Sequence, residues 1–332
     1  MPGFIVVTSI NEPTPAITSF SQLSEDWPLI MIGDRKTPVG WELKDVTFLS
    51  IADQGDSDQR LAKLLPENHY SRKQLGYLAA FEKDATSIFE TDDDNAPDGL
   101  DPRAFTPTPL ATAVRARKWV NPYPWFGHER AWPRGYPLGL LQVDQRLEVD
   151  GPTLRPSFIQ QYLANGEPDV DAIYRLVFGS TNARFDGPSI SIPPESYAPF
   201  NSQSTLWYEE AFPLMYLPSY VSFRMTDIWR SFVAQRCLWE IGSSLTYHAG
   251  AVYQSRNSHD LMRDFSDEIP GYKLNQEIVE RLDRLRLSPG IENVSSNLRR
   301  CYEALHDMNV IPGEELELVE AWIADIHEIR SA

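Results

Sequence analysis

Over the first hundred residues, continuous apolar runs alternate with segments whose apolar residues recur at helical spacing. The apolar runs are typical of buried strands and read GFIVVTSI, PLIMIGD, VTFLSI and ATSIFET along the chain. The segments between them, residues 14–23, 58–66 and 70–84, repeat apolar positions every three or four residues. Strands that alternate with helices in this way predict an α/β fold with a mostly parallel, Rossmann-like sheet flanked by helices.

The remainder of the chain divides into three regions. Residues 95–156 are rich in proline and aromatic residues, a composition typical of loops that cap a site. A second structured region follows over residues 172–265 and includes a predicted helix from Asp227 to Gly242. Helical periodicity then returns in three segments that start at residues 275, 295 and 313. We therefore predict an α/β domain over residues 1–270 and a C-terminal helical extension over residues 271–332.

The amino-acid composition excludes some kinds of binding partner and cellular location. The 332 residues carry a formal net charge of -17, so a diffuse basic surface for nucleic acid is not expected. The two cysteines, Cys237 and Cys301, lie far apart in the sequence and outside any zinc-ligand spacing, which favours a reducing compartment. No apolar run approaches the roughly 18 residues of a membrane span, and the N-terminus lacks a signal-peptide pattern. We expect a cytoplasmic protein with no membrane span.

Three consecutive aspartates, Asp92 to Asp94, follow the fourth apolar run directly. Two carboxylates held about 4 Å apart repel by about 4 kcal/mol at an effective dielectric constant of about 20. Exposure to water would offset this repulsion in a loop, and so would a bound cation. Asp92 and Asp94 are alternate residues, so extended backbone would point both side chains to one side. Mg²⁺ and Mn²⁺ are commonly held by one or two carboxylates together with water and substrate phosphates, which indicates a nucleoside diphosphate as the bridging ligand.

Further polar residues follow the other predicted strands. They are Thr8 to Glu12, Asp34 and Asp53. The carboxyl ends of parallel strands lie along one edge of a sheet, where α/β proteins bind ligands. Because the chain has no glycine-rich dinucleotide or P-loop motif, the usual signatures of those two nucleotide sites are missing.

Eight segments occur in the order found in a known family. They are VVTSINEPT, IMIGDRKTP, YSRKQLGYL, IFETDDDN, PRGYPL, FNSQSTLW, VSFRMTDIWRSFVAQRCLWEIG and VYQSRNSHDLMRDF. Together they resemble the STELLO-type glycosyltransferases and, more distantly, the plant reversibly glycosylated polypeptides that act as UDP-arabinopyranose mutases. The resemblance covers about residues 4 to 270 and leaves the C-terminal helices outside. It implies a GT-A fold that binds a nucleoside diphosphate sugar, a UDP-sugar being expected, with Mn²⁺ or Mg²⁺ as cofactor.

The resemblance also implies binding residues. Asp92 and Asp93 would bind the nucleotide sugar, Asp92 and Asp94 the metal, and Thr8 and Asp34 would lie near the uridine. Arg72 and Lys73 would meet the diphosphate or the sugar, unless they occupy a solvated helix face. Many GT-A enzymes add a histidine ligand to the metal, at a position that matches Gln254 here. His259, and less directly His248, are therefore candidate ligands, although either could be an ordinary core or surface histidine.

Two residues are candidates for catalysis. Arg134, in PRGYPL, matches the arginine that becomes glycosylated in the plant mutases. A guanidinium is normally too basic to act as a nucleophile, so we favour a charged Arg134 that stabilises the departing diphosphate. Asp227, in MTDIW, matches the second acid of an Asp-Asp-Met-Trp stretch in that family, with Thr226 in place of the first. It would act as a base or orient the donor sugar, and the alternative is an ordinary helix N-cap.

The sequence therefore predicts a metal-dependent glycosyltransferase with a UDP-sugar donor and an unidentified glycan or other acceptor. Two alternatives stay open. One is a UDP-sugar mutase or self-glycosylating protein, which would isomerise its donor or carry sugar on Arg134. The other is a non-catalytic scaffold that keeps the fold and perhaps the ligand, because a fold alone does not decide function.

Overall fold

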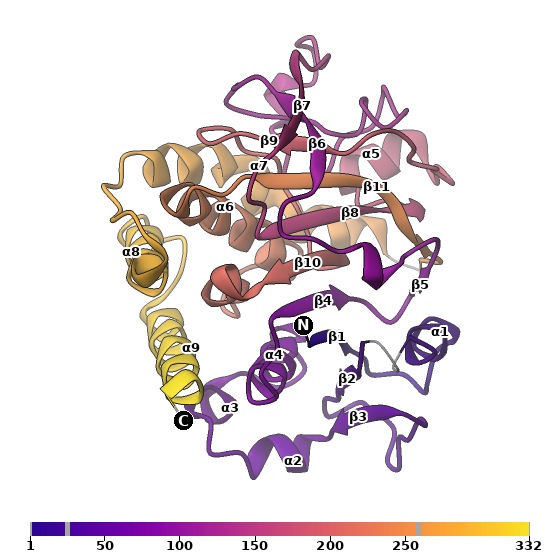
Figure 1. Cartoon of the computed structure of the whole chain (residues 1–332), viewed down its shortest axis with the longest axis vertical. Coiled ribbons are helices and arrows are strands. Elements are labelled where there is room, and N and C mark those ends of the chain that lie inside the picture. The colour runs from indigo at the N-terminus through magenta and orange to yellow at the C-terminus, as the bar shows by residue number, and fades with distance from the viewer. Residues whose placement is uncertain (1, 24–26, 257–259, 332) are drawn as a thin grey trace.

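A mixed β-sheet runs through the molecule, with helices on both faces (Figure 1). The computed structural model describes residues 2–23, 27–256 and 260–331. Within these ranges eleven strands form one sheet in the order β3-β2-β1-β4-β10-β8-β11-β9-β6-β7, and β5 pairs with β11. The strands are β1 Gly3–Thr8, β2 Leu29–Ile32, β3 Val46–Leu49, β4 Ser87–Thr91, β5 Asn95–Pro97, β6 Leu110–Val114, β7 Val149–Leu154, β8 Ile159–Gly166, β9 Ile190–Ile192, β10 Ser204–Tyr208 and β11 Leu245–Gln254. This architecture confirms the predicted α/β, GT-A-like fold.

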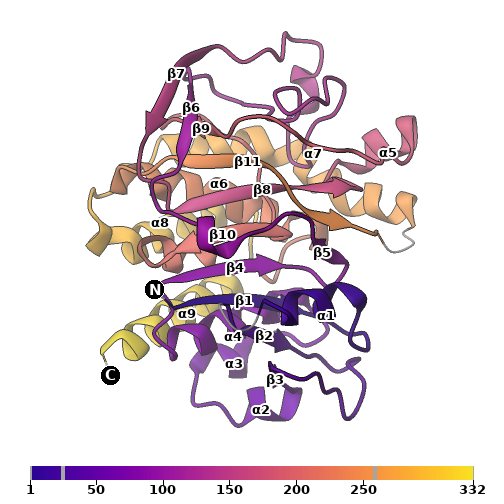
Figure 2. The same ribbon diagram turned by 45° about the vertical axis from the view of Figure 1, so that its right-hand side comes forward.

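The helices cover the sheet unequally. Figure 2 shows α4, α6 and α9 behind the sheet and α1 in front of it. The α-helices are α1 Pro15–Ser21, α2 Ile51–Gly55, α3 Arg60–Leu64, α4 Lys73–Phe81, α5 Ala172–Phe178, α6 Thr226–Leu238, α7 Leu261–Asp283, α8 Val294–Asp307 and α9 Gly313–Ser331. No helix within the described ranges is both long and apolar enough to cross a membrane.

The first four strands form the parallel half of the sheet. β1 pairs in parallel with β2 and β4, and β2 pairs in parallel with β3. Successive side chains of β1 enter opposite cores, since Phe4 and Val6 pack in the cluster that contains α4 while Ile5 and Val7 pack in the cluster that contains α1. A strand buried on both faces needs a continuous apolar sequence, which is the pattern GFIVVT.

Residues 95–156 contribute more than the predicted capping loops. They supply strands β5, β6 and β7, and β6 pairs with β9 and β7 at the far end of the sheet. Most of the aromatic side chains in these residues are buried in the hydrophobic core instead of lying on loop surfaces. The buried ones include Trp119, Tyr123, Phe126, Trp132 and Tyr136. The prediction failed because proline interrupts the local pattern, whereas burial of these rings depends on distant partners.

The C-terminal helices pack against the N-terminal half of the chain. Asp325 of α9 accepts hydrogen bonds from the backbone N–H groups of Arg60, at 3.0 Å, and Leu61, at 2.8 Å, and so caps the free end of α3. α8 lies beside α6, where the Sγ atoms of Cys237 and Cys301 are 3.7 Å apart in the core as free thiols. The two cysteines are distant in the sequence but in contact in the fold.

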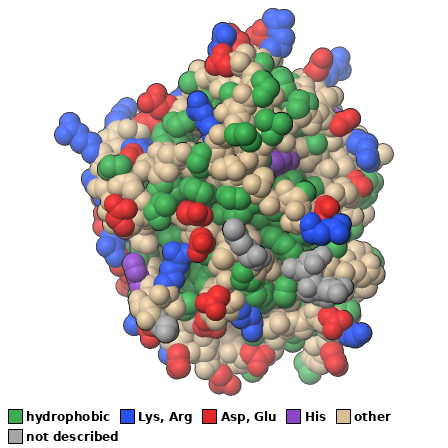
Figure 3. All heavy atoms as spheres, in the orientation of Figure 1, with side chains coloured by type: hydrophobic (Ala, Val, Ile, Leu, Met, Phe, Trp, Pro, Cys, Tyr) green, Lys and Arg blue, Asp and Glu red, His purple; other side chains and the backbone are tan. Residues whose placement is uncertain are grey.

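Charged side chains are spread over the face of the molecule shown in Figure 3. On the face shown in Figure 3, basic and acidic groups are interspersed near the outline, and apolar side chains gather toward the middle. The negative charge of the chain is therefore not confined to one patch of this face.

Glu315 of α9 links the C-terminal helices to the loop that leads into the candidate site. Its carboxylate accepts hydrogen bonds from the backbone N–H groups of Ser219 and Tyr220 and from the hydroxyl of Tyr216. We expect Glu315→Gln to lower the free energy of unfolding by about 1–3 kcal/mol, because the amide turns N–H groups toward buried donors. Calorimetric melting measures this change. The exposed Glu317→Gln on the same helix is the control, and equal melting of both variants would contradict the expected link.

Candidate active site

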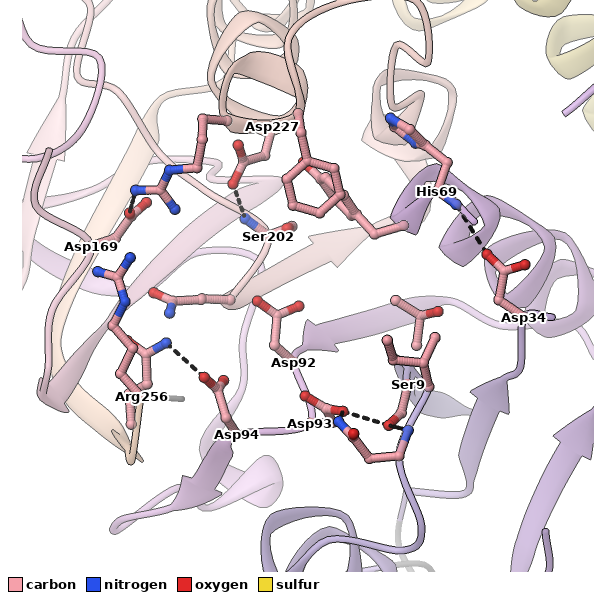
Figure 4. A pocket seen from close by; sticks show the side chains of 18 of the residues that line it. Ser9, Asp34, His69, Asp92, Asp93, Asp94, Asp169, Ser202, Asp227 and Arg256 are labelled. Atoms are coloured by element: carbon pink, nitrogen blue, oxygen red, sulfur yellow. Dashed lines mark hydrogen bonds and ion pairs between the residues drawn. The ribbon is translucent and has the colours of Figure 1, made fainter. Parts of the chain in front are cut away.

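A cavity of about 450 Å³ opens at the carboxyl ends of β1 and β4, a volume within the range of small-molecule sites. One side, here called the N-terminal wall, is lined by Thr8, Ser9, Asn11, Asp34, Lys36, Asn68 and His69. The opposite side, the C-terminal wall, is lined by Arg134, Asp169, Arg175, Arg224, Asp227, Gln254 and Arg256. Asp92, Asp93 and Asp94 lie between the two walls (Figure 4).

Each of the three aspartates has a different partner. Asp92 accepts a hydrogen bond from Lys73 Nζ at 2.6 Å, and Asp94 accepts one from Gln254 Nε2 at 3.1 Å. Asp93 turns toward the N-terminal wall, where Ser9 and Asn11 donate to it. The segment is a turn closed by a hydrogen bond from the N–H of residue 95 to the Asp92 carbonyl, 3.3 Å, rather than the expected extended strand. All three aspartates consequently line the cavity.

Lys73 is fully buried beneath Asp92. Its ammonium group also donates to the carbonyl of Thr91, at 2.8 Å, and approaches that of Ser202, at 3.4 Å. The alternative of a solvated helix face is therefore wrong for Lys73. Burial raises the pKa of Asp92 to about 6, against the opposing effect of Lys73. Lys73 thus orients the Asp92 carboxylate, but the positive charge of Lys73 only partly offsets the cost of burying that carboxylate.

The donor set at the aspartates suits a cation that arrives with its substrate. Among the described residues, no group of three or more His, Cys, Asp or Glu side chains is arranged to hold a metal ion. Asp92 and Asp94 are two hard oxygen donors, and Mg²⁺ or Mn²⁺ on two carboxylates would complete its shell with water and phosphate oxygens. The proposed ligand His259 lies outside the described residues.

The N-terminal wall contains both residues predicted near the uridine. Thr8 donates to the carbonyl of Ile32 at 3.0 Å. Asp34 accepts backbone hydrogen bonds from Asn68, at 2.9 Å, and His69, at 3.0 Å, and therefore holds the loop before α4 against the end of β2. Both side chains line the cavity, so the structure brings them together with the aspartates.

Arg72 does not line the cavity, although it precedes Lys73 directly. Its Nε donates to Gln54 Oε1 at 2.7 Å and its Nη1 to the carbonyl of Leu65 at 3.1 Å. The side chain is buried, so it does not form a solvated helix face either. The structure gives Arg72 a role in joining α2 and α3 to α4 instead of one in lining the cavity.

Arg134 lies between two carboxylates on the C-terminal wall. Its guanidinium makes paired hydrogen bonds to Asp169, at 2.9 and 2.8 Å, and to Asp227, at 2.8 Å each. The carbonyl of Arg224 accepts a further bond, so all five N–H groups have protein partners. Burial lowers the pKa of Arg134, but the charges of Asp169 and Asp227 outweigh it and raise the pKa well above its usual value. Arg134 is therefore held in its charged form.

Asp227 is not a helix N-cap. The helix α6 starts at Thr226, with Met225 in the capping position, and Asp227 lies within its first turn. Its carboxylate instead pairs with Arg134 and lies 3.4 Å from the backbone N of Ser202. The capping alternative for Asp227 was wrong, because the helix begins at Thr226, two residues earlier than an N-cap at Asp227 requires.

Comparison with known proteins agrees with the resemblance inferred from the motifs. The sequence profile of the family described as STELLO glycosyltransferases matches residues 224–331. Two Arabidopsis thaliana proteins, described as probable glycosyltransferases STELLO2 and STELLO1, are 29% and 28% identical over 353 aligned residues, which include 97% of this chain. The chain is similar to the STELLO glycosyltransferases. It spans 44% of the length of those relatives.

The STELLO-type resemblance extends further than the motifs indicated. The profile match includes all of α8 and α9, so the predicted end of the resemblance near residue 270 was wrong. The contacts of Glu315 and Asp325 give a physical reason, since these helices complete the packing beneath the site. Sequence motifs alone did not reveal them, because amphipathic helices share a common pattern in unrelated proteins.

Two further positions predicted from the sequence lie elsewhere in the fold. His248 bonds Ser189 and Gln160 and stacks on Tyr162 with ring centroids 4.3 Å apart, and burial lowers its pKa to about 4. It does not line the cavity and is a half-buried histidine held by these contacts. Asp53 forms a capping box with Ser50 in α2 and also lies outside the cavity lining.

Several lining residues were missed in the sequence. Those on the C-terminal wall are Asp169, Arg175, Arg224 and Arg256, and those between the walls include Tyr70, Ser202, Gln203 and Phe223. Asp169 follows β8 in the acidic stretch EPDVD, much as the three aspartates follow β4. That repeated pattern of apolar strand and acidic turn was a usable signal for Asp169.

Proposed function

We propose that this chain transfers a sugar from a nucleoside diphosphate sugar, with a UDP-sugar as the expected donor, to an acceptor. The observation that carries this proposal is the cavity in which Asp92 to Asp94 separate a polar wall from a wall with a buried Arg134–Asp227 pair. The relationship to glycosyltransferases supports the reaction class. The N-terminal wall would hold the nucleoside, which places the sugar toward the C-terminal wall.

Asp92 and Asp94 would hold the Mn²⁺ or Mg²⁺ that accompanies the donor. When bound, the ion would supply positive charge to neutralise the departing diphosphate. Lys73 and Gln254 orient the two carboxylates through hydrogen bonds of 2.6 and 3.1 Å, so the ligands are positioned before the substrate arrives. Preorganisation of this kind lowers the cost of binding.

Arg134, Asp169 and Asp227 form a rigid group beside the proposed sugar position. Because both oxygens of Asp227 accept hydrogen bonds from Arg134, protonating Asp227 would break a buried ion pair. This geometry favours Asp227 as a residue that orients the sugar hydroxyls by accepting their hydrogen bonds over a role as general base. Arg134 would then contribute indirectly, by holding the carboxylates of Asp169 and Asp227 in position.

Ligand-dependent melting tests the proposed function. We expect UDP-sugars with Mn²⁺ to raise the melting temperature, since a ligand at 100 times its dissociation constant adds about 2.7 kcal/mol of stability. The shift should disappear with EDTA. Release of UDP in the presence of acceptors then separates an enzyme from a scaffold, which would bind without turnover. Absence of any shift with all UDP-sugars would contradict the proposal.

The mutase-like alternative makes a separate prediction at Arg134. We expect the intact mass of the protein to stay unchanged after incubation with UDP-sugars and Mn²⁺, because a charged guanidinium with five partnered N–H groups is not a nucleophile. Mass spectrometry of the whole chain checks this. A gain of one sugar mass that is absent in Arg134→Lys would favour a self-glycosylating protein instead.

A further inference from the structure

The charges that line the cavity are divided between its two sides. Asp34 and Lys36 lie on the N-terminal wall, and the acidic residues Asp92, Asp93 and Asp94 lie between the walls, where Asp94 bonds Gln254 of the C-terminal wall. The C-terminal wall instead contributes four arginines and two aspartates, namely Arg134, Arg175, Arg224, Arg256, Asp169 and Asp227. The proposed metal ion and diphosphate would neutralise the acidic residues. In that arrangement the arginines of the C-terminal wall have no ligand of their own.

Three of these arginines, Arg175, Arg224 and Arg256, form what is here called the arginine cluster. Each pairs with a carboxylate that does not itself line the cavity: Glu167 at 2.6 Å, Glu268 at 2.8 Å and Asp264 at 2.7 Å. The carboxylates therefore stand behind the guanidinium groups and orient them. In each ion pair the arginine, and not the carboxylate, lines the cavity.

The three guanidinium groups are close enough to influence one another. Burial and then the charges of Arg175 and Arg224 lower the pKa of Arg256 to about 10. Nε of Arg175 is buried without a hydrogen-bond partner among the residues that the structure describes, whereas Nη2 of Arg224 lies 2.8 Å from the carboxylate of Glu268. Three like charges close together and an unpaired buried donor at Arg175 are costly even with their carboxylate partners, and a further anion in the cavity would reduce this cost.

We propose that the arginine cluster binds an anionic group, a carboxylate or a phosphate, that the substrate carries in addition to the donor diphosphate. This inference rests on the proposed function, in which the diphosphate lies with the metal at Asp92 and Asp94. Arg224 lies 3.9 Å from Asp169 on the C-terminal wall, beside the position proposed for the transferred sugar, and Arg175 lines the same wall. The anion belongs either to the donor's sugar, as in a uronic acid, or to the acceptor.

Isothermal calorimetry on the full chain with Mn²⁺ distinguishes the two sources. The donor arm compares UDP-glucuronic acid with UDP-glucose, and the acceptor arm compares glucose 6-phosphate with glucose in the presence of UDP. We expect the acidic probe of one arm to bind about tenfold or more tightly than its neutral counterpart. Arg256→Gln should remove this preference, and Arg263→Gln, which removes an exposed charge outside the cavity, should keep it.

Other outcomes overturn the inference. Equal binding of acidic and neutral probes in both arms does so, as does a preference that survives in Arg256→Gln and in Arg175→Gln, each shown by melting to be folded. If Arg256→Gln weakens UDP and UDP-glucose as much as the acidic probes, the cluster serves the diphosphate and the inference is wrong. Failure of UDP to bind the wild type counts against the proposed function alone, because glucose 6-phosphate without nucleotide still tests the arginine cluster.

Discussion

Replacing Asp92 and Asp94 together by asparagine is expected to abolish metal-dependent binding of UDP-sugars, with a loss of affinity of about 100-fold or more. An amide is a much weaker ligand for Mn²⁺ than a carboxylate, and without the ion the diphosphate meets an acidic surface. The fold should survive, because the new amide at position 92 keeps an oxygen that can accept from Lys73 and the repulsion between neighbouring carboxylates falls. Calorimetric titration with UDP and Mn²⁺ measures the affinity.

Asp101→Asn is a matched control, since it removes one carboxylate from a nearby turn that does not line the cavity. It should bind UDP as the wild type does. The metal-site proposal would be abandoned if the double variant, still folded, bound UDP with unchanged affinity. Equal binding by the wild type in Mn²⁺ and in EDTA would lead to the same conclusion.

Asp227→Asn is expected to reduce turnover by about 10²-fold or more, because the sugar loses its positioning, while UDP affinity stays nearly constant. The substitution keeps the shape but removes the charge that faces the proposed sugar position. The new side chain retains one oxygen acceptor for Arg134, and Asp169 still pairs with that arginine at 2.8 Å. The loss of stability should therefore be smaller than the roughly 3–5 kcal/mol that follows complete loss of a buried partner. UDP release and thermal melting measure the two effects.

The matched control for this variant is Glu240→Gln, which also removes a carboxylate from an arginine pair, with Arg236, at the other end of α6. Its turnover should be unchanged. A folded Asp227→Asn protein with wild-type turnover would exclude Asp227 from the mechanism. A parallel loss of UDP affinity would instead assign Asp227 to binding of the nucleotide.

The sequence determined the parallel half of the fold and the location of the aspartates. Apolar runs such as GFIVVT and SIFET can be satisfied only when both faces are buried, so they become the central strands β1 and β4. Parallel strands place their carboxyl ends at one edge, and the sheet therefore brings Thr8 and Asp92 to the same cavity. These consequences follow from local periodicity and strand direction.

Arg72 and Lys73 show that the local sequence pattern does not by itself determine which residues a side chain contacts. The two basic residues are adjacent, yet Lys73 bonds Asp92 while Arg72 bonds Gln54 and Leu65. Successive side chains near a helix start point in directions that differ by roughly 100°, so neighbours in sequence enter different surroundings. The packing of α2 and α3 determined which of the two reached the aspartates.

Contacts between distant segments were decided by the tertiary structure alone. Arg134 and Asp227 are 93 positions apart, and nothing in either local sequence indicates that they pair. The arginine cluster likewise combines a residue within α5, one just before α6 and one just after β11. The sequence determines which side chains are available at strand ends and helix starts. Which of them meet depends on how the helices close over the sheet, because burial and ion pairing act between groups that only the fold brings within reach.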